Sequence, residues 1–143
     1  MRALSIDFGE KRIGLALSDS LGLIATPLEV FEYTSREKAL ERIAATIKRK
    51  DAREVVVGLP LEMDGHRGVK AIEAEEFADS LRKIIDIPVF CWDERLTTAE
   101  AQRALLEGDV SRAGRRQRAD MVAAALLLQS YLETRRNKES RPK

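Results

Sequence analysis

Three carboxylate side chains stand where apolar segments of the sequence end. Asp7 follows a short apolar run near the start of the chain, Glu94 follows the run at 88–92, and Asp120 precedes the apolar segment 121–128. An ionised carboxylate at such a boundary is costly to bury without a partner. Hard oxygen ligands suit Mg²⁺ or Mn²⁺, and two such ions can stabilise both the attacking and the leaving oxygen of a phosphoryl displacement. The three residues are therefore candidate metal ligands and catalytic residues.

Each acid also has a simpler explanation. Asp7 can accept hydrogen bonds from the amides of the turn that follows it. Glu94 can pair with Arg95 or Arg12, and Asp120 can occupy a helix N-terminus, where the helix dipole favours an acid. No cluster of His or Cys accompanies the acids, so the sequence does not predict a zinc site.

A group of arginines immediately precedes Asp120. The segment 111–118 contains no acid and four arginines, Arg112, Arg115, Arg116 and Arg118. These cations can hold phosphates on either side of a scissile bond, and Arg12 and Arg95 are further candidate contacts to nucleic acid. A solvated basic loop is the alternative interpretation. Because aromatic residues make up only 5% of the chain, we expect recognition of backbone and shape rather than base stacking.

Strands and helices that could position these residues alternate along the chain. The predicted strands lie at 3–6, 13–17, 23–31, 54–58 and 88–92. Gly9 allows a tight turn between the first two, and Pro27 places the third at an edge or a bend. The β-branched run at 54–58 is typical of a central parallel strand buried on both faces.

Four helices are predicted from apolar residues at helical spacing and from capping sequences. They begin at the capping boxes 34–37 and 97–100, at about Val69, and at Asp120. They end near Lys50, Leu106, Ile85 and Tyr131, respectively. The residues predicted to face inward on the helices at 34–50 and 69–85 are Leu40, Ile43, Ala44, Ile47, Val69, Ile72, Phe77, Leu81 and Ile84.

This order of elements predicts an α/β fold. A meander of three strands followed by right-handed crossovers gives a five-stranded mixed sheet flanked by helices on both faces. If the strands that precede Asp7 and Glu94 are parallel, both acids emerge at the same edge of the sheet. Open α/β sheets place their functional sites at that edge.

Length and composition limit the remaining possibilities. A chain of 143 residues predicts one domain, placed here at 1–134, and a basic tail at 135–143 that is expected to fray. The net charge of +1 neither favours nor excludes a polyanionic partner. The single cysteine, Cys91, is expected to be a small buried residue, Trp92 a core residue and His66 a surface residue. Without an apolar span or a signal sequence, the protein is expected to be cytoplasmic.

Four separated blocks of sequence resemble the YqgF/RuvX family. They are D-F-G with R-I-G at 7–14, V-G-L-P with M-D-G at 57–65, D-E-R-L-T-T-A-E-A at 93–101, and Asp120 with the segment 123–132. The resemblance implies a ribonuclease H-like fold whose metal-binding acids fall on Asp7, Glu94 and Asp120. One departure is Glu10, which stands where the family often has Thr and adds an acid near the site.

The activity that this resemblance implies is that of a bacterial nuclease maturing the 5′ end of precursor 16S ribosomal RNA with Mg²⁺ or Mn²⁺. Such a protein would act on RNA as a monomer or weak homodimer, without a membrane partner. An earlier assignment of the family, a Holliday junction resolvase acting on branched DNA, is one alternative and would require a stable dimer. Another is a non-catalytic ribosome-assembly factor that binds RNA through the arginines.

Overall fold

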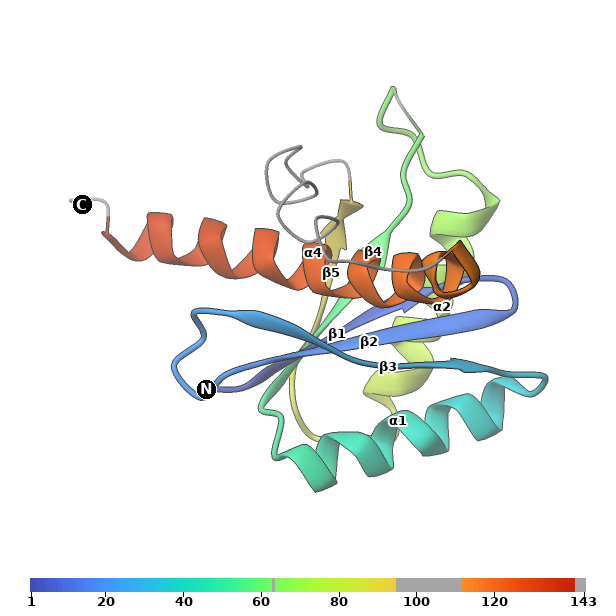
Figure 1. The fold of residues 1–143 in the computed structure, drawn as a ribbon, viewed down its shortest axis with the longest axis horizontal. Helices are drawn as coiled ribbons and strands as arrows, with labels where there is room; N and C mark the ends of the chain where they lie inside the picture. The colour runs from blue at the N-terminus through green and yellow to red at the C-terminus, as the bar shows by residue number, and fades with distance from the viewer. Residues whose placement is uncertain (63, 95–111, 141–143) are drawn as a thin grey trace.

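A single mixed sheet forms the centre of the computed structural model, which describes residues 1–62, 64–94 and 112–140 (Figure 1). The strands are β1 (Ala3–Phe8), β2 (Arg12–Ser18), β3 (Ala25–Glu32), β4 (Glu54–Leu59) and β5 (Val89–Asp93), in the order β3-β2-β1-β4-β5. β1 pairs with β2 antiparallel and with β4 parallel, and β4 pairs with β5 parallel. The predicted five-stranded mixed sheet is confirmed.

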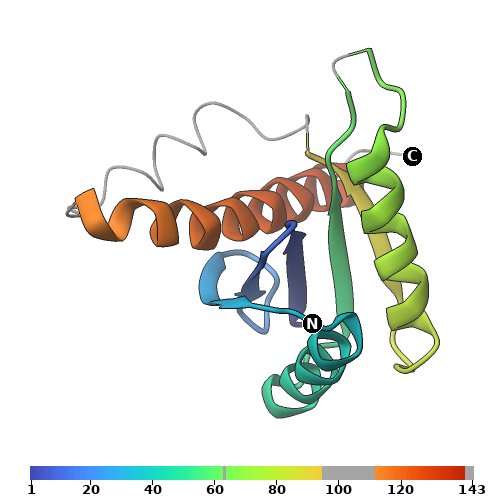
Figure 2. The ribbon, with the colours of Figure 1, turned by 90° about the vertical axis from the view of Figure 1, so that its right-hand side faces the viewer.

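Helices cover both faces of the sheet, as predicted (Figure 2). α1 (Arg36–Lys50) and α2 (Val69–Arg82) pack on one face, while α4 (Arg112–Ser140) packs on the other. Successive side chains of β1 point to opposite faces of the sheet. Leu4 and Ile6 face α1 and α2, whereas Ala3 and Ser5 face α4. The α4 face carries small residues, and the Ser5 hydroxyl donates a hydrogen bond of 2.7 Å to the Ala124 carbonyl. These small residues let α4 lie close to the sheet.

The edge strand β3 differs slightly from its predicted bounds. It begins at Ala25, two residues later than expected, and Leu23 and Ile24 are exposed in the turn before it. Pro27 does lie on an edge strand, since β3 pairs only with β2. The pairing shifts register between Leu15 and Ala16, next to Pro27, which agrees with the tendency of proline to occur at bulges.

The helix that follows β3 is capped one residue later than the capping box predicts. Ser35, not Thr34, is the N-cap of α1, and its hydroxyl accepts a hydrogen bond from the Lys38 amide. The buried face of α1 includes Leu40, Ile43 and Ile47 as predicted.

The inward face predicted for the helix at 69–85 is wrong at three β-branched residues. Val69, Ile72 and Ile84 are 73%, 44% and 52% exposed, whereas Phe77 and Leu81 are fully buried. The remaining buried positions of α2 are alanines, Ala71, Ala74 and Ala78. A stripe of small side chains allows the helix to approach the sheet closely, and it turns the larger β-branched residues outward.

The final helix is longer at both ends than the apolar pattern predicts. α4 begins at Arg112 and spans 29 residues, so the arginine-containing segment 112–118, for which a solvated loop was the alternative interpretation, is helical. It also continues to Ser140, past the predicted start of a fraying tail at Arg135, because the Arg135 guanidinium pairs with the buried Glu54 carboxylate and lies over the Tyr131 ring. The predicted helix at 97–106 lies outside the described residues. In the described part of the chain, none of the helices combines the length and the hydropathy needed to cross a bilayer.

Candidate active site

Two of the three predicted acids meet at one edge of the sheet. β1, β4 and β5 run parallel, so their carboxyl ends lie together. Asp7 is the penultimate residue of β1, and Glu94 directly follows the last residue of β5. Their side chains are hydrogen-bonded to each other although 87 positions separate them in the sequence. The parallel pairing thus produces the contact that the strand order led us to expect.

Gly58 on the intervening strand makes room for the Glu94 side chain. A Cβ atom at this position would lie 3.1 Å from both Cγ and Cδ of Glu94 and closer still to Oε1. The glycine is the fifth residue of β4, opposite Trp92 of β5. Glu94 can therefore fold back over the strand towards Asp7 only because position 58 has no side chain.

Electrostatic repulsion and burial act together on Glu94. Burial makes the largest contribution, followed by the neighbouring Asp7 carboxylate and then Asp93, and together they raise the pKa of Glu94 from 4.5 to about 7. Two carboxyl groups in contact cannot both ionise without a compensating positive charge. The pair therefore retains a proton near neutral pH unless a cation replaces it.

A cavity of about 190 Å³ opens at this pair. The residues that line it are Asp7, Phe8, Gly9, Glu10, Pro60, Lys70, Glu73 and Glu94. Its rim is built from the β1–β2 turn, the loop after β4 and the start of α2. In that turn the Gly9 amide donates a 3.0 Å hydrogen bond to the Arg12 carbonyl, and a Cβ at Gly9 would lie 2.7 Å from the same oxygen. The glycine is thus required by the turn, as its position in the sequence suggested.

The third predicted acid can be placed only by its backbone. Ser5 contacts Ala124, and Leu132, two turns further along α4, lies near Gly22 together with Met1. α4 therefore runs antiparallel to β1, and position 120, one turn before Ala124, lies towards the end of β1 that carries Asp7. The side chain of Asp120 lies outside the described part of the structure.

The predicted nucleic-acid contacts are only partly described. Arg12 begins β2, close to the cavity, and has interactions of its own in this structure. Positions 112, 115, 116 and 118 lie in the first two turns of α4, but their side chains, like all of Arg95, lie outside the described residues. These assignments remain predictions.

Three further residues that sequence analysis singled out have clear places. His66 is exposed in the loop after β4, as predicted, with its Nδ1 atom 2.6 Å from Oδ1 of Asp64. Cys91 is half-buried, and burial raises the pKa of its thiol, so it is a packing residue. Trp92 is also half-buried, packed edge-on against Tyr131 rather than enclosed in the core.

Sequence analysis missed Gly58, Lys70 and Glu73 as parts of the site. Gly58 ends a β-branched run, and a glycine within a strand can signal a close approach by another group. Lys70 and Glu73 stand one helical turn apart on a helix that starts beside the cavity. No pattern in the sequence marks them, because only the packing of α2 brings them to Asp7.

The donor set fits a hard divalent cation. Asp7 and Glu94 present carboxylate oxygens, the ligand type that Mg²⁺ and Mn²⁺ prefer, and a cation between them would replace the proton that they otherwise share. Among the side chains that the structure describes, no three His, Cys, Asp or Glu residues group closely enough to hold a metal ion. Asp120, the third acid that the sequence predicts, has its side chain outside the described residues, so its role as a further donor stays a prediction.

The stability of the metal-free protein should depend on pH through Glu94. Its pKa is about 7 in the folded protein and 4.5 for an ordinary glutamate, so between these values the folded state binds more protons than the unfolded state. The free energy of unfolding should consequently fall as pH rises from 4.5 to 7, by roughly 1–3 kcal/mol. Thermal unfolding in chelator at pH 5 and pH 8 measures the effect. Glu94→Gln should flatten it, and an equal pH dependence in wild type and variant would contradict the assignment.

Two solved structures with a similar arrangement of strands and helices contain Holliday junctions. Thermus thermophilus RuvC, solved in complex with a Holliday junction substrate, matches 95% of this chain and 96% of its own with a TM-score of 0.58 at 16% identity. The fowlpox virus resolvase, solved with Holliday junction DNA, matches 94% of this chain and 98% of its own with a TM-score of 0.56 at 14% identity. At such low identity the likeness defines the fold alone, and that fold is ribonuclease H-like.

Sequence relatives define the group more narrowly. A candidate pre-16S rRNA nuclease of Halothermothrix orenii is 46% identical over 132 residues, covering 92% of this chain and 94% of the relative. A relative of the same name from Desulforudis audaxviator is 44% identical over 137 residues, covering 96% and 97%. The profile of the family described as "RuvX: Holliday junction resolvase" matches residues 1–134. The chain belongs to the RuvX family of nucleases.

Proposed function

We propose that this protein is a divalent-metal-dependent endonuclease that processes the 5′ end of precursor 16S ribosomal RNA in the cytoplasm. The observation that carries the proposal is the contact between the Asp7 and Glu94 carboxyl groups at the carboxyl edge of the parallel strands. The two relatives reported above are 44–46% identical to this chain over nearly its full length, and both are named as candidate pre-16S rRNA nucleases.

Asp7, Glu94 and Asp120 would hold the metal in this proposal. Bound there, Mg²⁺ or Mn²⁺ supplies charge stabilisation for an in-line displacement at phosphorus and an activated water. The protein's own contribution is to fix the two described carboxylates: β1 and β5 set their separation, and Gly58 lets Glu94 turn inward. Lys70, at the wall of the same cavity, offers a positive charge to an entering phosphate.

The arginines would bind the substrate strand. Arg12, Arg95, Arg112, Arg115, Arg116 and Arg118 are proposed to contact phosphates beside the scissile bond. The first turns of a helix are a favourable place to bind a phosphate, because the backbone amides there attract anions in addition to the arginine side chains. The helical start of α4 at Arg112 supports this part of the proposal.

The test is incubation of the purified protein with labelled precursor 16S 5′-end RNA in Mn²⁺ and in Mg²⁺, with chelator as the control. Discrete cleavage that chelator abolishes is the expected result. RNA binding that survives chelation, without any cleavage, would instead favour a non-catalytic assembly factor.

A second candidate substrate is a four-way DNA junction. The family description and the two similar structures solved with Holliday junctions support testing this substrate as well. Symmetric cutting of a junction requires two sites, so a resolvase should sediment as a stable dimer at working concentration. A monomer that cleaves the RNA and leaves the junction intact would decide for the first substrate.

Gly58→Ala should lower cleavage activity with little loss of stability. The added methyl group would collide with the Glu94 carboxylate, the movable end of a side chain, and should push it away from Asp7. Changing a residue that orients a metal ligand, as Gly58 orients Glu94, typically costs about 10–100-fold in activity or metal affinity. The rate with RNA and the thermal midpoint check this. In a Glu94→Ala background the same substitution should have no further effect on rate, and an additive loss would show that Gly58 acts elsewhere.

A further inference from the structure

A group of cations gathers at the end of the sheet opposite the acid-lined cavity. We define the basic end as Arg2, Lys48, Arg49, Lys50 and Arg136. Four of the five are exposed and Lys50 is half-buried. They come from three separate elements: the residue before β1, the last turn of α1, and the C-terminal part of α4.

Hydrogen bonds and an ion pair place these three segments at the same end of the sheet. The Arg2 guanidinium donates a hydrogen bond of 3.1 Å to the Lys50 carbonyl, and the Arg53 amide donates one of 2.8 Å to the Arg2 carbonyl. The Glu54 carboxylate, which is buried at the start of β4, pairs with Arg135 and so brings α4 to the same end. Arg136, the next residue of α4, lies at this end of the helix and is exposed.

Three of the acids nearby are already engaged. Glu54 is held by Arg135, and Asp51 lies 3.1 Å from Arg53. Asp19 accepts hydrogen bonds of 2.7 and 3.0 Å from the amides of Leu23 and Ile24. Within the described part of the chain, none of the five cations of the basic end has a carboxylate at ion-pair distance.

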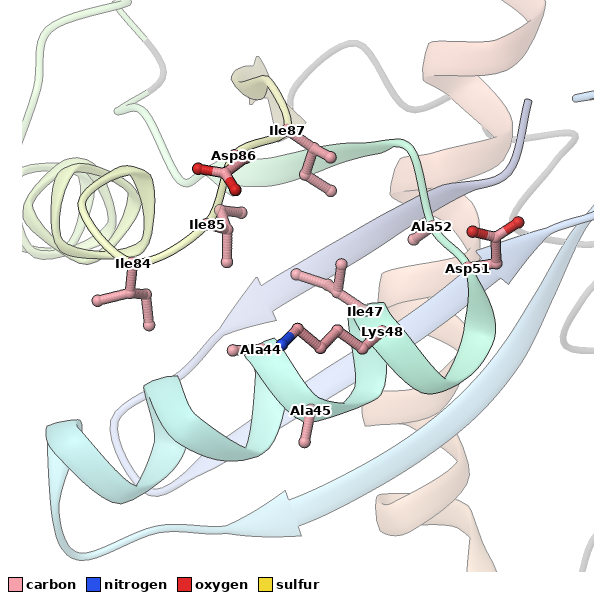
Figure 3. A pocket seen from close by; sticks show the side chains of 10 residues that line it. All are labelled: Ala44, Ala45, Ile47, Lys48, Asp51, Ala52, Ile84, Ile85, Asp86 and Ile87. Atoms are coloured by element: carbon pink, nitrogen blue, oxygen red, sulfur yellow. The ribbon is translucent and has the colours of Figure 1, made fainter.

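Lys48 also lines a cavity of about 610 Å³ between α1 and the segment before β5 (Figure 3). Its side chain lies along α1 beside Ala44, and the remaining wall is largely apolar, with Ile47, Ile84 and Ile87. Asp51 and Asp86 stand at the rim of this cavity. Asp51 already pairs with Arg53, and among the described residues no ion pair joins Asp86 to Lys48.

Distance along β1 separates the basic end from the acids. Arg2 and Asp7 are five residues apart on one extended strand, or about 16 Å at roughly 3.3 Å per residue. The cavity at Asp7 also contains Glu10, Glu73 and Glu94, so without a bound cation it repels a polyanion. Affinity for a nucleic acid must therefore come from cations elsewhere. Because the net charge of the whole chain is only +1, a polyanion is attracted by local groups of cations and not by the overall charge.

We propose that the basic end binds the phosphodiester backbone of the RNA substrate at a position remote from the cut. This inference rests on the proposed nuclease function and extends it, because it assigns a second contact surface to the same substrate. Helix C-terminal charges alone would account for Lys48, Arg49 and Lys50. They do not account for Arg2 and Arg136, which belong to other elements and lie at the same end of the sheet.

The experiment compares two triple variants that differ only in charge. Lys48→Gln/Arg49→Gln/Arg136→Gln removes three cations, whereas Lys48→Arg/Arg49→Lys/Arg136→Lys keeps them. Binding of labelled precursor 16S 5′-end RNA is measured in chelator over a range of salt concentrations, with a four-way DNA junction in parallel. Each lost phosphate contact should lower the slope of log K against log salt by about 0.7–0.9. The glutamine variant should lose about two units of slope and bind RNA roughly tenfold more weakly at low salt, while the charge-preserving variant binds like wild type.

The inference is overturned if the glutamine variant keeps the wild-type slope, if both variants lose affinity equally, or if only DNA binding changes. Cleavage in Mn²⁺ provides a second readout, in which the glutamine variant should raise KM and leave kcat unchanged. Because binding is measured without metal, loss of RNA affinity in a protein that never cleaves would support the basic end and refute the proposed nuclease. If the glutamine variant binds RNA normally and wild type cleaves it, the proposed nuclease is supported and the role of the basic end is refuted.

Discussion

Replacing Asp7 with Asn should slow RNA cleavage by at least about 100-fold. Groups that merely orient a metal ligand are worth 10–100-fold, so loss of a proposed ligand itself should cost no less. Asn keeps the size of the side chain but loses the charge that would bind a cation next to Glu94. Initial rates with labelled RNA at saturating Mn²⁺ measure the effect. Wild-type cleavage by this variant would rule out Asp7 as a catalytic ligand.

A second measurement on the same variant separates chemistry from folding. Removing the Asp7 charge eliminates one cause of the raised pKa of Glu94, so the metal-free variant should unfold at a higher temperature than wild type at pH 8. The matched control is Asp86→Asn, the same change at an exposed acid before β5, at the opposite end of the strands. It should cleave at the wild-type rate. A variant that loses both activity and stability would point to a structural role for Asp7.

Arg135→Ala should cost about 3 kcal/mol of unfolding free energy, the low end of the range for breaking a buried ion pair. Glu54 is only 5% exposed, and without Arg135 its carboxylate would remain buried beside the Tyr131 hydroxyl with no cation to compensate it. Urea unfolding followed by circular dichroism provides the value. The exposed pair of Arg53 with Asp51 serves as the comparison, since Arg53→Ala should cost only about 0.2–1 kcal/mol.

The cause of that loss can be isolated with a double variant. Glu54→Gln/Arg135→Ala should recover much of the stability, because it removes the unpaired charge as well as its partner. A chain ending at residue 134 should behave like Arg135→Ala. If Arg135→Ala costs no more than Arg53→Ala, the docking of α4 beyond residue 134 does not contribute to stability.

Local sequence determined the elements and the positions of two acids within them. The β-branched run of β4 predicted a strand buried on both faces, and the apolar segments before Asp7 and Glu94 predicted where β1 and β5 end. Strand propensity and burial pattern are properties of short segments, so they can be recognised without knowledge of the fold. The rule that parallel strands share a carboxyl edge then predicted the meeting of Asp7 and Glu94.

Helix faces and helix ends were predicted less well. The inward face of α2 combines Phe77 and Leu81 with the alanines 71, 74 and 78 and excludes Val69 and Ile72, and α4 extends beyond its apolar segment in both directions. Hydrophobic periodicity weights large side chains, whereas close packing on a sheet selects small ones. Periodicity alone therefore assigned Val69 and Ile72 to the wrong side.

Only the tertiary structure decided the contacts between distant segments. Gly58 makes room for Glu94 from a different strand, Glu54 pairs with Arg135 across 81 positions, and the cations of the basic end come from three elements. No short stretch of sequence predicts these contacts. They depend on the register of β4 between β1 and β5 and on the direction of α4 across the sheet. The sequence thus determined which residues could do chemistry, while the parallel pairing and the packing of α4 decided which of them lie together.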